Sequence, residues 1–472
     1  MYNRKYFIAS LFFILAIGSY TANGQQSGQK QQKPQLWLSD PEHNVLFKLQ
    51  DQPLKQPGTL KNVPVITVDP SKTYQQIDGF GFALTGGSAM LINKMSANAQ
   101  AELLKELFGL GKTGIGTSYL RISIGASDLD DHVFSYDDLP PGKTDADLKE
   151  FSLANDKKAL ISVLKKILAI NPHIKILGSP WSPPAWMKTN DSTGGGHLKP
   201  EYYHTYSQYF VKYIKGMAAN GIRIDAITIQ NEPLNSNNNP SMIMEATEQA
   251  NFIKNNLGTD FETAKIKTKI ILYDHNADRP DYPITILNDP QAKKYVDGSA
   301  FHLYGGKIEA LSEVHKAHPD KNLYFTEQWV GAPGNMEKEL HFAVKELIIG
   351  ATRNWCRNVL EWNLAADPNQ KPHTPGGCSE CLGAITIDGD KITRNPAYYT
   401  IAHASKFVRP GSKRIASNNI KELPNVAFLA ATGKMVLIVF NDSASAQTFQ
   451  IKYHGKLVDA ILNRGSTGTY VF

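Results

Sequence analysis

The sequence is poor in cysteine. Its 472 residues include three, Cys356, Cys378 and Cys381, and an odd number leaves at least one thiol free or in an intermolecular bond. Cys378-Ser-Glu-Cys381 could form a disulfide-closed loop or half of a metal site. A zinc site needs about four ligands, and the sequence has no second CxxC and no paired histidine motif. We therefore expect no metal, and favour a Cys378–Cys381 disulfide in an oxidising compartment.

The sequence also lacks a basic block and a dinucleotide motif. The formal net charge is +6, but lysine and arginine are scattered along the chain, so we expect no nucleic-acid partner. Gly79-Phe-Gly81 follows a β-rich run without the spacing of a GxGxxG loop, which argues against a nucleotide site. We expect no cofactor.

After the first residues, the sequence has no apolar run long enough to span a membrane. Residues 1–24 begin with Arg4 and Lys5, continue with an apolar run over 6–17 and end in Ala-Asn-Gly. That pattern is typical of a signal peptide, and the run is shorter than the roughly 20 residues of a membrane anchor. The sequence predicts export to the periplasm, cell surface or medium, with no membrane insertion after cleavage. Residues 25–35, rich in Gln, Lys and Gly, are predicted to be a flexible tether.

The middle of the chain alternates short β-rich runs with helical patterns. Continuous apolar stretches such as Ile227–Ile229 are typical of parallel strands buried on both faces. We predict an α/β fold, a closed (β/α)8 TIM barrel over residues 71–403; an open doubly wound sheet is the alternative, disfavoured by the missing glycine-rich loop. The eight β-rich runs are 77–85, 118–125, 175–182, 225–231, 269–274, 298–304, 322–327 and 358–364, and helical patterns cover 98–110, 156–170, 200–220, 243–257 and 337–350.

Both ends of the chain have a different pattern. Short strand-like runs separated by turn residues every 8–12 positions are typical of a β-sandwich. We predict a β-sandwich over residues 404–472, completed by N-terminal strands within residues 36–70. The predicted strands are 36–38, 63–68, 414–416, 426–431, 435–440, 448–453, 459–462 and 468–471.

Two acidic residues stand where barrel strands end. The fourth run ends in Gln230-Asn-Glu232-Pro, and the seventh in Thr326-Glu327-Gln-Trp. Active sites of such barrels lie at the carboxyl ends of the strands, and glycosidic cleavage requires two carboxyl groups on either side of the scissile bond. Glu232 and Glu327 are therefore predicted to be catalytic; the alternative is a structural ion pair.

The same strand ends carry many aromatic rings. A single ring is more often part of a core, but rings gathered at one end of the barrel predict a platform for the apolar faces of sugars. Nearby polar side chains offer hydrogen bonds to hydroxyl groups. The rings are Trp181, Trp186, His302, Tyr304, Trp329 and Trp362, and the polar residues are Arg121, Asp128, Asn231 and Asn363.

These segments resemble glycoside hydrolase family 30, whose clan includes lysosomal glucosylceramidase and bacterial and fungal β-1,6-glucanases. The likeness covers nearly the whole mature chain in order, and it implies a (β/α)8 barrel with an attached β-sandwich. The segment Ser179–Asn190, SPWSPPAWMKTN, is the most specific. The matching segments are Asp78–Gly81, Tyr119–Ser123, Ser179–Asn190, Asn231–Pro233, Phe301–Tyr304, Thr326–Glu327, Glu361–Leu364 and His403–Phe407.

The resemblance implies a role for each matching residue. Glu232 resembles the acid/base, which needs a raised pKa, and Glu327 the nucleophile of a retaining enzyme, about 5–5.5 Å away. Asn231 would hold the sugar 2-hydroxyl. Asp128, Trp181 and Trp362 match the glucose subsite. Arg121 and Tyr304 match residues around the nucleophile, where a positive charge keeps Glu327 ionised.

Two loops resemble the β-1,6-glucanase branch of the family: Thr85–Ser88, and Pro372–Gly383, which we expect to border the leaving-group side. The predicted function is a retaining endo-β-1,6-glucanase that cleaves β-1,6-linked glucan. One alternative is an exo-acting β-glucosidase, glucosylceramidase or β-xylosidase of the same family. An alternative of another class is a non-catalytic carbohydrate-binding protein.

Overall fold

Eight parallel strands close into a barrel, in the order β10-β12-β4-β5-β6-β7-β8-β9. The computed structural model describes residues 1, 34–51, 54 and 56–472, so nearly all of the predicted signal peptide and of the predicted tether lies outside the described residues. Each of the eight predicted β-rich runs overlaps a barrel strand, and the predicted fold class is confirmed. The strands are β4 (Gly79–Ala83), β5 (Tyr119–Ser123), β6 (Lys175–Ser179), β7 (Ala226–Thr228), β8 (Lys269–Ala277), β9 (Val296–Gly306), β10 (Asn322–Glu327) and β12 (Cys356–Asn363).

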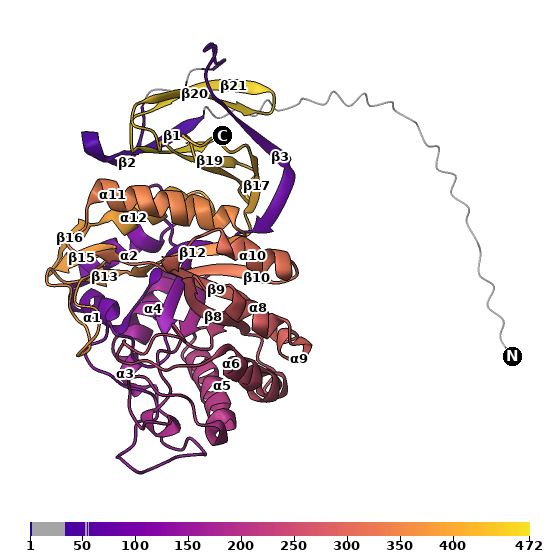
Figure 1. Cartoon of the computed structure of the whole chain (residues 1–472). Helices are drawn as coiled ribbons and strands as arrows, with labels where there is room; N and C mark the ends of the chain where they lie inside the picture. Colours follow the sequence, from indigo (N-terminus) through magenta and orange to yellow (C-terminus); the bar gives the residue numbers. More distant parts are fainter. Residues whose placement is uncertain (2–33, 52–53, 55) are drawn as a thin grey trace. The chain divides into compact units, whose positions relative to one another are not determined.

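Helices surround the barrel (Figure 1). In α4, Leu160, Val163, Leu164 and Ile167 are buried, at the three- and four-residue spacing that places side chains on one helix face. The predicted helix 156–170 is divided between α3 and α4, and the predicted helix 243–257 runs through α6 into the π-helical segment η4. The helices are α1 (Gly86–Lys94), α2 (Ala97–Phe108), α3 (Ala154–Lys157), α4 (Leu160–Ile170), α5 (Tyr203–Ala219), α6 (Ala246–Phe252), η4 (Ile253–Leu257), α7 (Gly258–Thr263), α8 (Asp281–Leu287), α9 (Pro290–Lys293), α10 (Ala310–Ala317), α11 (Met336–Phe342), η5 (Ala343–Ala351) and α12 (Pro396–Ser405).

The inside of the barrel changes from apolar to charged along the strands. Tyr119, Leu177, Ala226, Ile271, Ala300, Tyr324 and Leu360 form one buried cluster. Because side chains alternate along a strand, Arg121 lies on the same face of β5 as Tyr119, two residues nearer the carboxyl end. Arg121 is fully buried. The carboxyl end of the barrel is therefore built from polar side chains supported by an apolar layer.

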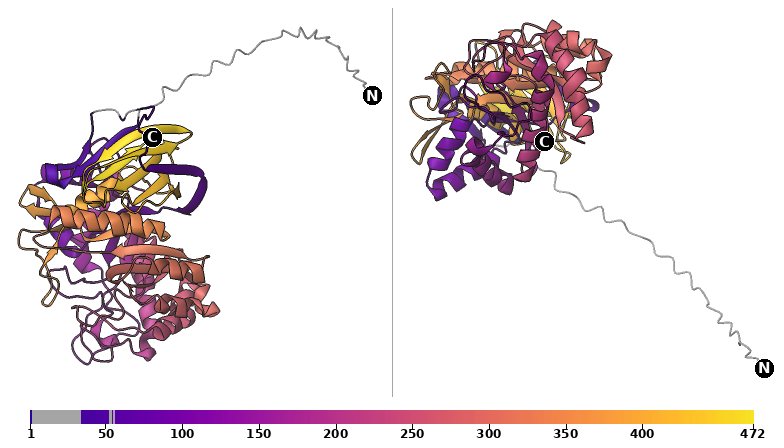
Figure 2. Two further views of the ribbon diagram at one scale, coloured as in Figure 1. Left: turned by 45° about the horizontal axis from the view of Figure 1, so that its top comes forward. Right: turned by 90° about the horizontal axis from the view of Figure 1, so that it is seen from below.

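The β-sandwich combines strands from both ends of the chain, in the order β2-β1-β22-β19-β18-β17-β3-β20-β21. β1 pairs with β22, and β3 pairs with β20 through Val65–Thr67 and with β17 through Val68–Gln76. Figure 2 shows the indigo N-terminal strands among the yellow C-terminal strands. The strands are β1 (Gln35–Asp40), β2 (Val45–Leu49), β3 (Val65–Gln76), β17 (Lys413–Ser417), β18 (Asn425–Leu429), β19 (Met435–Phe440), β20 (Gln447–Tyr453), β21 (Lys456–Leu462) and β22 (Thr467–Val471).

The observed boundaries differ from the predicted ones by a few residues. β1 already begins at Gln35, inside the predicted tether, and β3 continues to Gln76, past the predicted barrel start at 71. The predicted boundary between 403 and 404 falls inside α12. The predicted boundaries were set at turn residues in the sequence. β3 continues past such residues because it pairs with two strands, β20 and β17, along its length.

Helix α12 joins the barrel to the sandwich through His403. The ring is fully buried, and its Nδ1 and Nε2 each lie 2.8 Å from a hydroxyl, of Thr469 on β22 and Ser39 on β1. Burial lowers the pKa of His403 to about 3, so the imidazole is neutral and exchanges hydrogen bonds with both hydroxyls. Among the described helices, none is long and apolar enough to cross a membrane.

Candidate active site

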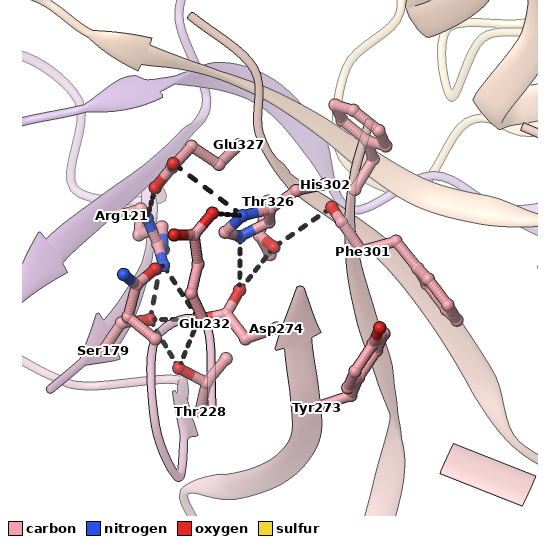
Figure 3. Close-up of polar contacts among 12 residues, drawn as sticks. Arg121, Ser179, Thr228, Glu232, Tyr273, Asp274, Phe301, His302, Thr326 and Glu327 are labelled. Carbon is pink, nitrogen blue, oxygen red and sulfur yellow. Dashed lines mark hydrogen bonds and ion pairs between the residues drawn. The ribbon is translucent and has the colours of Figure 1, made fainter. Parts of the chain in front are cut away.

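Glu232 and Glu327 meet at the carboxyl end of the barrel (Figure 3). Glu327 is the last residue of β10, and Glu232 lies just beyond β7 with a left-handed backbone (φ 45°). Its N–H donates to the Asp274 carbonyl at 2.9 Å, which turns the side chain into the barrel mouth. One carboxylate oxygen of each glutamate and one nitrogen of His302 lie within 4.8 Å of one another.

Both oxygens of Glu327 are held by neighbouring side chains. Arg121 pairs with Oε2, and the Tyr304 hydroxyl donates to Oε1 at 2.9 Å. Arg121 also donates to Asn231 Oδ1 at 2.6 Å and to Asp274 Oδ2 at 2.8 Å. The guanidinium thus fixes the orientation of Glu327 and places a positive charge beside it.

Glu232 belongs to a chain of three titratable side chains. His302 lies between Asp274 and Glu232, with Nε2 3.1 Å from Asp274 Oδ1 and Nδ1 3.2 Å from Glu232 Oε1. Asn235 donates to the other oxygen of Glu232 at 2.7 Å. Arg121 and the hydroxyl of Thr326, at 2.6 Å, both donate to Asp274, so Asp274 is stabilised as a carboxylate.

The two glutamates open into a pocket of about 300 Å³. Trp181 and Trp362 stack in its wall with ring centroids 5.3 Å apart, and Tyr304, 39% exposed, lies nearer the solvent. The buried Nε1 of Trp181 has no hydrogen-bond partner among the described residues, so it is free to donate to a ligand. The lining residues are Asp128, Trp181, Glu232, Asn235, Asn238, His275, Asn276, Tyr304, Glu327, Trp329, Trp362, Cys378 and Cys381.

Comparison with known proteins assigns both parts of the fold. Residues 77–408 match the glycosyl hydrolase family 30 TIM-barrel domain, and residues 411–470 match the glycosyl hydrolase family 30 beta sandwich domain. The chain belongs to glycoside hydrolase family 30. It is therefore a glycosidase, and the family resemblance found in the sequence is confirmed.

Several family 30 relatives are similar over most of the chain. An endo-1,6-β-D-glucanase of Neurospora crassa is 36% identical over 80% of this chain and 81% of its own length. Lysosomal acid glucosylceramidase of Mus musculus is 29% identical over 80% and 78%. Among solved structures, the endo-β1,6-glucanase BT3312 superposes with a TM-score of 0.86 and 34% identity, covering 93% of this chain and 99% of that one.

The two glutamates have pKa shifts in opposite directions in the structure. Burial raises the pKa of Glu327, and His302 and Arg121 offset only part of that increase. Burial also favours a neutral Glu232, but the hydrogen bond and charge of His302 outweigh it and lower the pKa of Glu232 to about 2. The raised pKa expected of Glu232 when a substrate is bound did not take this pairing with His302 into account.

His302 holds a proton next to Glu232. Burial opposes protonation of His302, but the charge of Glu327 and the hydrogen bonds to Asp274 and Glu232 raise the pKa of His302 to about 9. Because the Asp274 carboxylate accepts from Nε2, the opposite nitrogen Nδ1 faces Glu232 Oε1. One proton can therefore lie on either of these two atoms.

The structure brings most of the predicted site residues together. Arg121, Asn231 and His302 are not among the residues that line the pocket. Arg121 and His302 contact the glutamates, and Asn231 accepts a hydrogen bond from Arg121. Asn363 also lies outside the lining, since its Oδ1 accepts from Ser88 at 2.9 Å. Trp186 points away from the pocket and donates from Nε1 to the Asp137 carbonyl at 2.9 Å. The predicted residues that line the pocket are Asp128, Trp181, Glu232, Tyr304, Glu327, Trp329, Trp362, Cys378 and Cys381.

Several residues of the site were not identified from the sequence. Asp274 lies in the fifth barrel strand near its carboxyl end, so the search for acidic residues at strand ends could have found it. Asn235 and Asn238 lie in the loop after β7, in the asparagine-rich segment 235–239. The composition of this segment does not predict that Asn235 contacts Glu232. His275 and Asn276 continue β8 into the pocket lining.

Cys378 and Cys381 form a disulfide, and Cys356 is a buried free thiol. Cys378 N–H donates to Asp128 Oδ2 at 3.3 Å. The loop was expected to border the leaving-group side, whereas this contact places it on Asp128, which the resemblance assigned to the glucose subsite. The backbone of this loop reaches Asp128, which follows β5, since Thr374 N–H also donates to the Asp128 carbonyl at 2.9 Å.

Glu232, His302 and Glu327 are close enough to act as three metal ligands. Their ligand atoms are already engaged, since Arg121 and Tyr304 hold Glu327 while His302 and Asn235 hold Glu232. A metal ion would also need a neutral His302, whereas its pKa is raised to about 9. The donor set fits proton transfer better than metal binding.

Proposed function

We propose that this family 30 enzyme is an endo-β-1,6-glucanase that hydrolyses β-1,6-linked glucan with retention of configuration. The observation that carries the mechanism is the carboxylate pair, whose nearest oxygens lie within 4.8 Å. Retaining glycosidases place their carboxyl groups about 5–5.5 Å apart, whereas inverting enzymes leave roughly 6.5–9.5 Å for a water. The linkage is supported by the similarity to the Neurospora crassa endo-1,6-β-D-glucanase and to BT3312.

In the first step, a Glu327 oxygen attacks the anomeric carbon while Glu232 donates its proton to the leaving oxygen. The glycosyl–Glu327 ester is then hydrolysed by a water that Glu232 deprotonates. Arg121 and Tyr304 orient the nucleophile throughout. His302 supplies the proton to Glu232 before the first step and can take it back after the second.

The pocket lining supports a glucose subsite around the carboxylate pair. We assign Asp128, Trp181 and Trp362 to that subsite, where the stacked rings offer an apolar wall and the carboxylate accepts from sugar hydroxyls. Trp329 and Tyr304 lie nearer the mouth and are assigned to neighbouring sugar units. Asn231, whose Oδ1 accepts from Arg121, is assigned to the 2-hydroxyl.

Digestion of linear β-1,6-, β-1,3- and β-1,4-linked glucans tests the proposed linkage and mode of action. Products are sized at successive times. We expect β-1,6-glucan to yield a mixture of oligosaccharides from the earliest times. An early product pool of glucose alone would show exo action, and cleavage of another linkage alone would overturn the proposed substrate. Binding of the glucans without any product would instead favour a non-catalytic carbohydrate-binding protein.

We also propose that the enzyme is exported, on the basis of the predicted signal peptide in residues 1–24. Expression in a Gram-negative host followed by cell fractionation tests this proposal. We expect activity outside the cytoplasm and a mature N-terminus at Gln25. Recovery of an uncleaved chain in the cytoplasm would contradict it.

A further inference from the structure

A loop packed on Asp128 forms one wall of the pocket. We call residues 367–380 the disulfide loop; it connects β13 (Ala365–Ala366) to β14 (Cys381–Leu382). Thr374 N–H donates to the Asp128 carbonyl at 2.9 Å. A Cβ on Gly377 would lie 2.3 Å from that carbonyl, so only glycine allows the loop backbone to approach Asp128 this closely. Cys378 N–H reaches the carboxylate itself at 3.3 Å.

The other end of the loop is fixed to the strand that follows the nucleophile. Cys381 pairs with Gly331 of β11 (Val330–Gly331), and Ala332 N–H donates to the Glu380 carbonyl at 2.8 Å. β11 begins three residues after Glu327. Cys381 belongs to a buried cluster with Trp181 and Trp362, and Cys378 and Trp329 pack against that cluster.

The Cys378–Cys381 bond therefore joins two walls of the pocket, one carrying Asp128 and one carrying Trp329. We propose that this disulfide is a positioning element of the glucose subsite: it holds Cys378 N–H on Asp128 and makes substrate affinity depend on the oxidised state. This proposal takes the identity of the substrate, β-1,6-linked glucan, from the proposed function. A dithiol supplies the two electrons and two protons that convert the bond to two thiols, and is itself oxidised to a cyclic disulfide.

Loss of the bond should loosen only part of the loop. Thr374 remains attached through its hydroxyl, which donates to the Asn239 carbonyl at 2.6 Å. Pro375 and Glu380 also remain attached, since their carbonyls accept from Asn239 at 3.0 Å and from Ala332 N–H at 2.8 Å. The loosened part is therefore the short segment 376–379, in which Cys378 N–H makes the 3.3 Å bond to Asp128. Contacts of Asp128 with glucose exist in both the bound substrate and the transition state, and weakening such contacts raises KM more than it lowers kcat.

The test compares oxidised enzyme, enzyme reduced with dithiothreitol, and a Cys378→Ala/Cys381→Ala double variant. Mass spectrometry after alkylation of an aliquot counts the thiols, with buried Cys356 as an internal reference. One assay is KM and kcat on linear β-1,6-glucan. The second is the rate at which an activated 2-deoxy-2-fluoro-β-glucoside labels Glu327, which does not depend on the linkage. Ser379→Ala, an exposed change between the two cysteines, is the matched control.

We expect reduction to raise KM about tenfold with kcat within about twofold, the size expected for the loss of one hydrogen bond. We also expect reduction to slow labelling at low reagent concentration. The double variant should match the reduced enzyme and not respond to dithiothreitol, whereas Ser379→Ala should behave as wild type. Unchanged KM and labelling in enzyme shown to be reduced would overturn the proposal.

Two further outcomes separate this proposal from the proposed function. Slower labelling on reduction without any cleavage of β-1,6-glucan would contradict the substrate and support the positioning role. If the double variant fails to fold, KM and the labelling rate of the reversibly reduced wild type test the proposal. If dithiothreitol does not reduce the bond, KM and the labelling rate of the double variant test the proposal.

Discussion

At the scale of single residues, position at a strand end predicted the two glutamates of the site, but their partners across the barrel could not be read from the sequence. Glu232 and Glu327 follow directly from the rule that barrel sites lie at the carboxyl ends of strands. His302 satisfies the same rule, yet its role depends on Asp274, one strand away. Which side chains of different strands meet can be predicted only when the register and strand order are known, so the pairing that lowers the pKa of Glu232 was not predicted.

The assignment of Glu327 as the nucleophile makes a rescue prediction. Glu327→Ala removes the attacking oxygen, so turnover should fall by at least about 10³-fold, on the scale of losing a covalent catalytic group. Azide or formate can occupy the vacated space and attack in its place, so either anion should restore part of the activity. Kinetics with an activated aryl glucoside measure this. Glu327→Gln with unchanged turnover would contradict the assignment.

The pairing of His302 with Glu232 predicts the alkaline limb of the pH profile. The shared proton is needed for the leaving oxygen, and it is lost as pH rises through the raised pKa of His302, about 9. In His302→Gln, Glu232 alone holds the proton, so the alkaline limb of kcat/KM should move down by about one unit or more. A profile from pH 4 to 10 measures the shift. The exposed His173→Gln is the control, and an unmoved limb in His302→Gln would contradict the pairing.

At the scale of elements, the strands and helices were predictable because hydrophobic periodicity is local, whereas the exact ends and the loops were not. Helix α4 has its apolar residues at helical spacing in the sequence itself. By contrast, the contacts of the loop after β12 with Asp128 and β11 were not predicted, since they join segments far apart along the chain. Its position is set by tertiary hydrogen bonds that leave no periodic pattern.

Strand β12 contains a buried acidic residue, Glu361, that makes the free energy of unfolding depend on pH. Glu361 is buried, neither oxygen has a hydrogen-bond partner among the described residues, and burial raises its pKa to about 8. The folded state therefore binds a proton that the unfolded state releases, and stability falls as pH rises from about 4.5 towards 8. Glu361→Gln should resemble wild type near pH 5 and be more stable at pH 9 by on the order of a few kcal/mol.

Urea unfolding at the two pH values measures the effect of Glu361→Gln. Glu201, which is exposed, provides the matched control, and Glu201→Gln should leave the pH dependence as in wild type. If the free energies of unfolding of Glu361→Gln and wild type differ by the same amount at both pH values, Glu361 is not held neutral in the folded protein.

At the scale of the whole molecule, the sequence predicted both architectural parts and the assembly of the sandwich from both chain ends, because the strand patterns at the two ends are alike. It could not show how the two parts are joined. His403 matched a family segment, but its role follows only from the structure, where a neutral imidazole lies between β1 and β22. Residues 34–472 form one compact unit, and this junction is a polar contact within it.

The buried position of His403 predicts a loss of stability without a loss of catalysis. His403→Ala removes a buried ring and leaves the hydroxyls of Ser39 and Thr469 without their partner, so the free energy of unfolding should fall by about 2–4 kcal/mol. Helix α12 contributes no residue to the pocket lining, so kcat/KM of the folded variant should stay within about twofold of wild type. Urea unfolding and glucan hydrolysis measure the two quantities, with the exposed His173→Ala as control. A variant with wild-type stability would show that the barrel and sandwich are held together without this residue, and one with normal stability and lost activity would show that the junction acts on the active site.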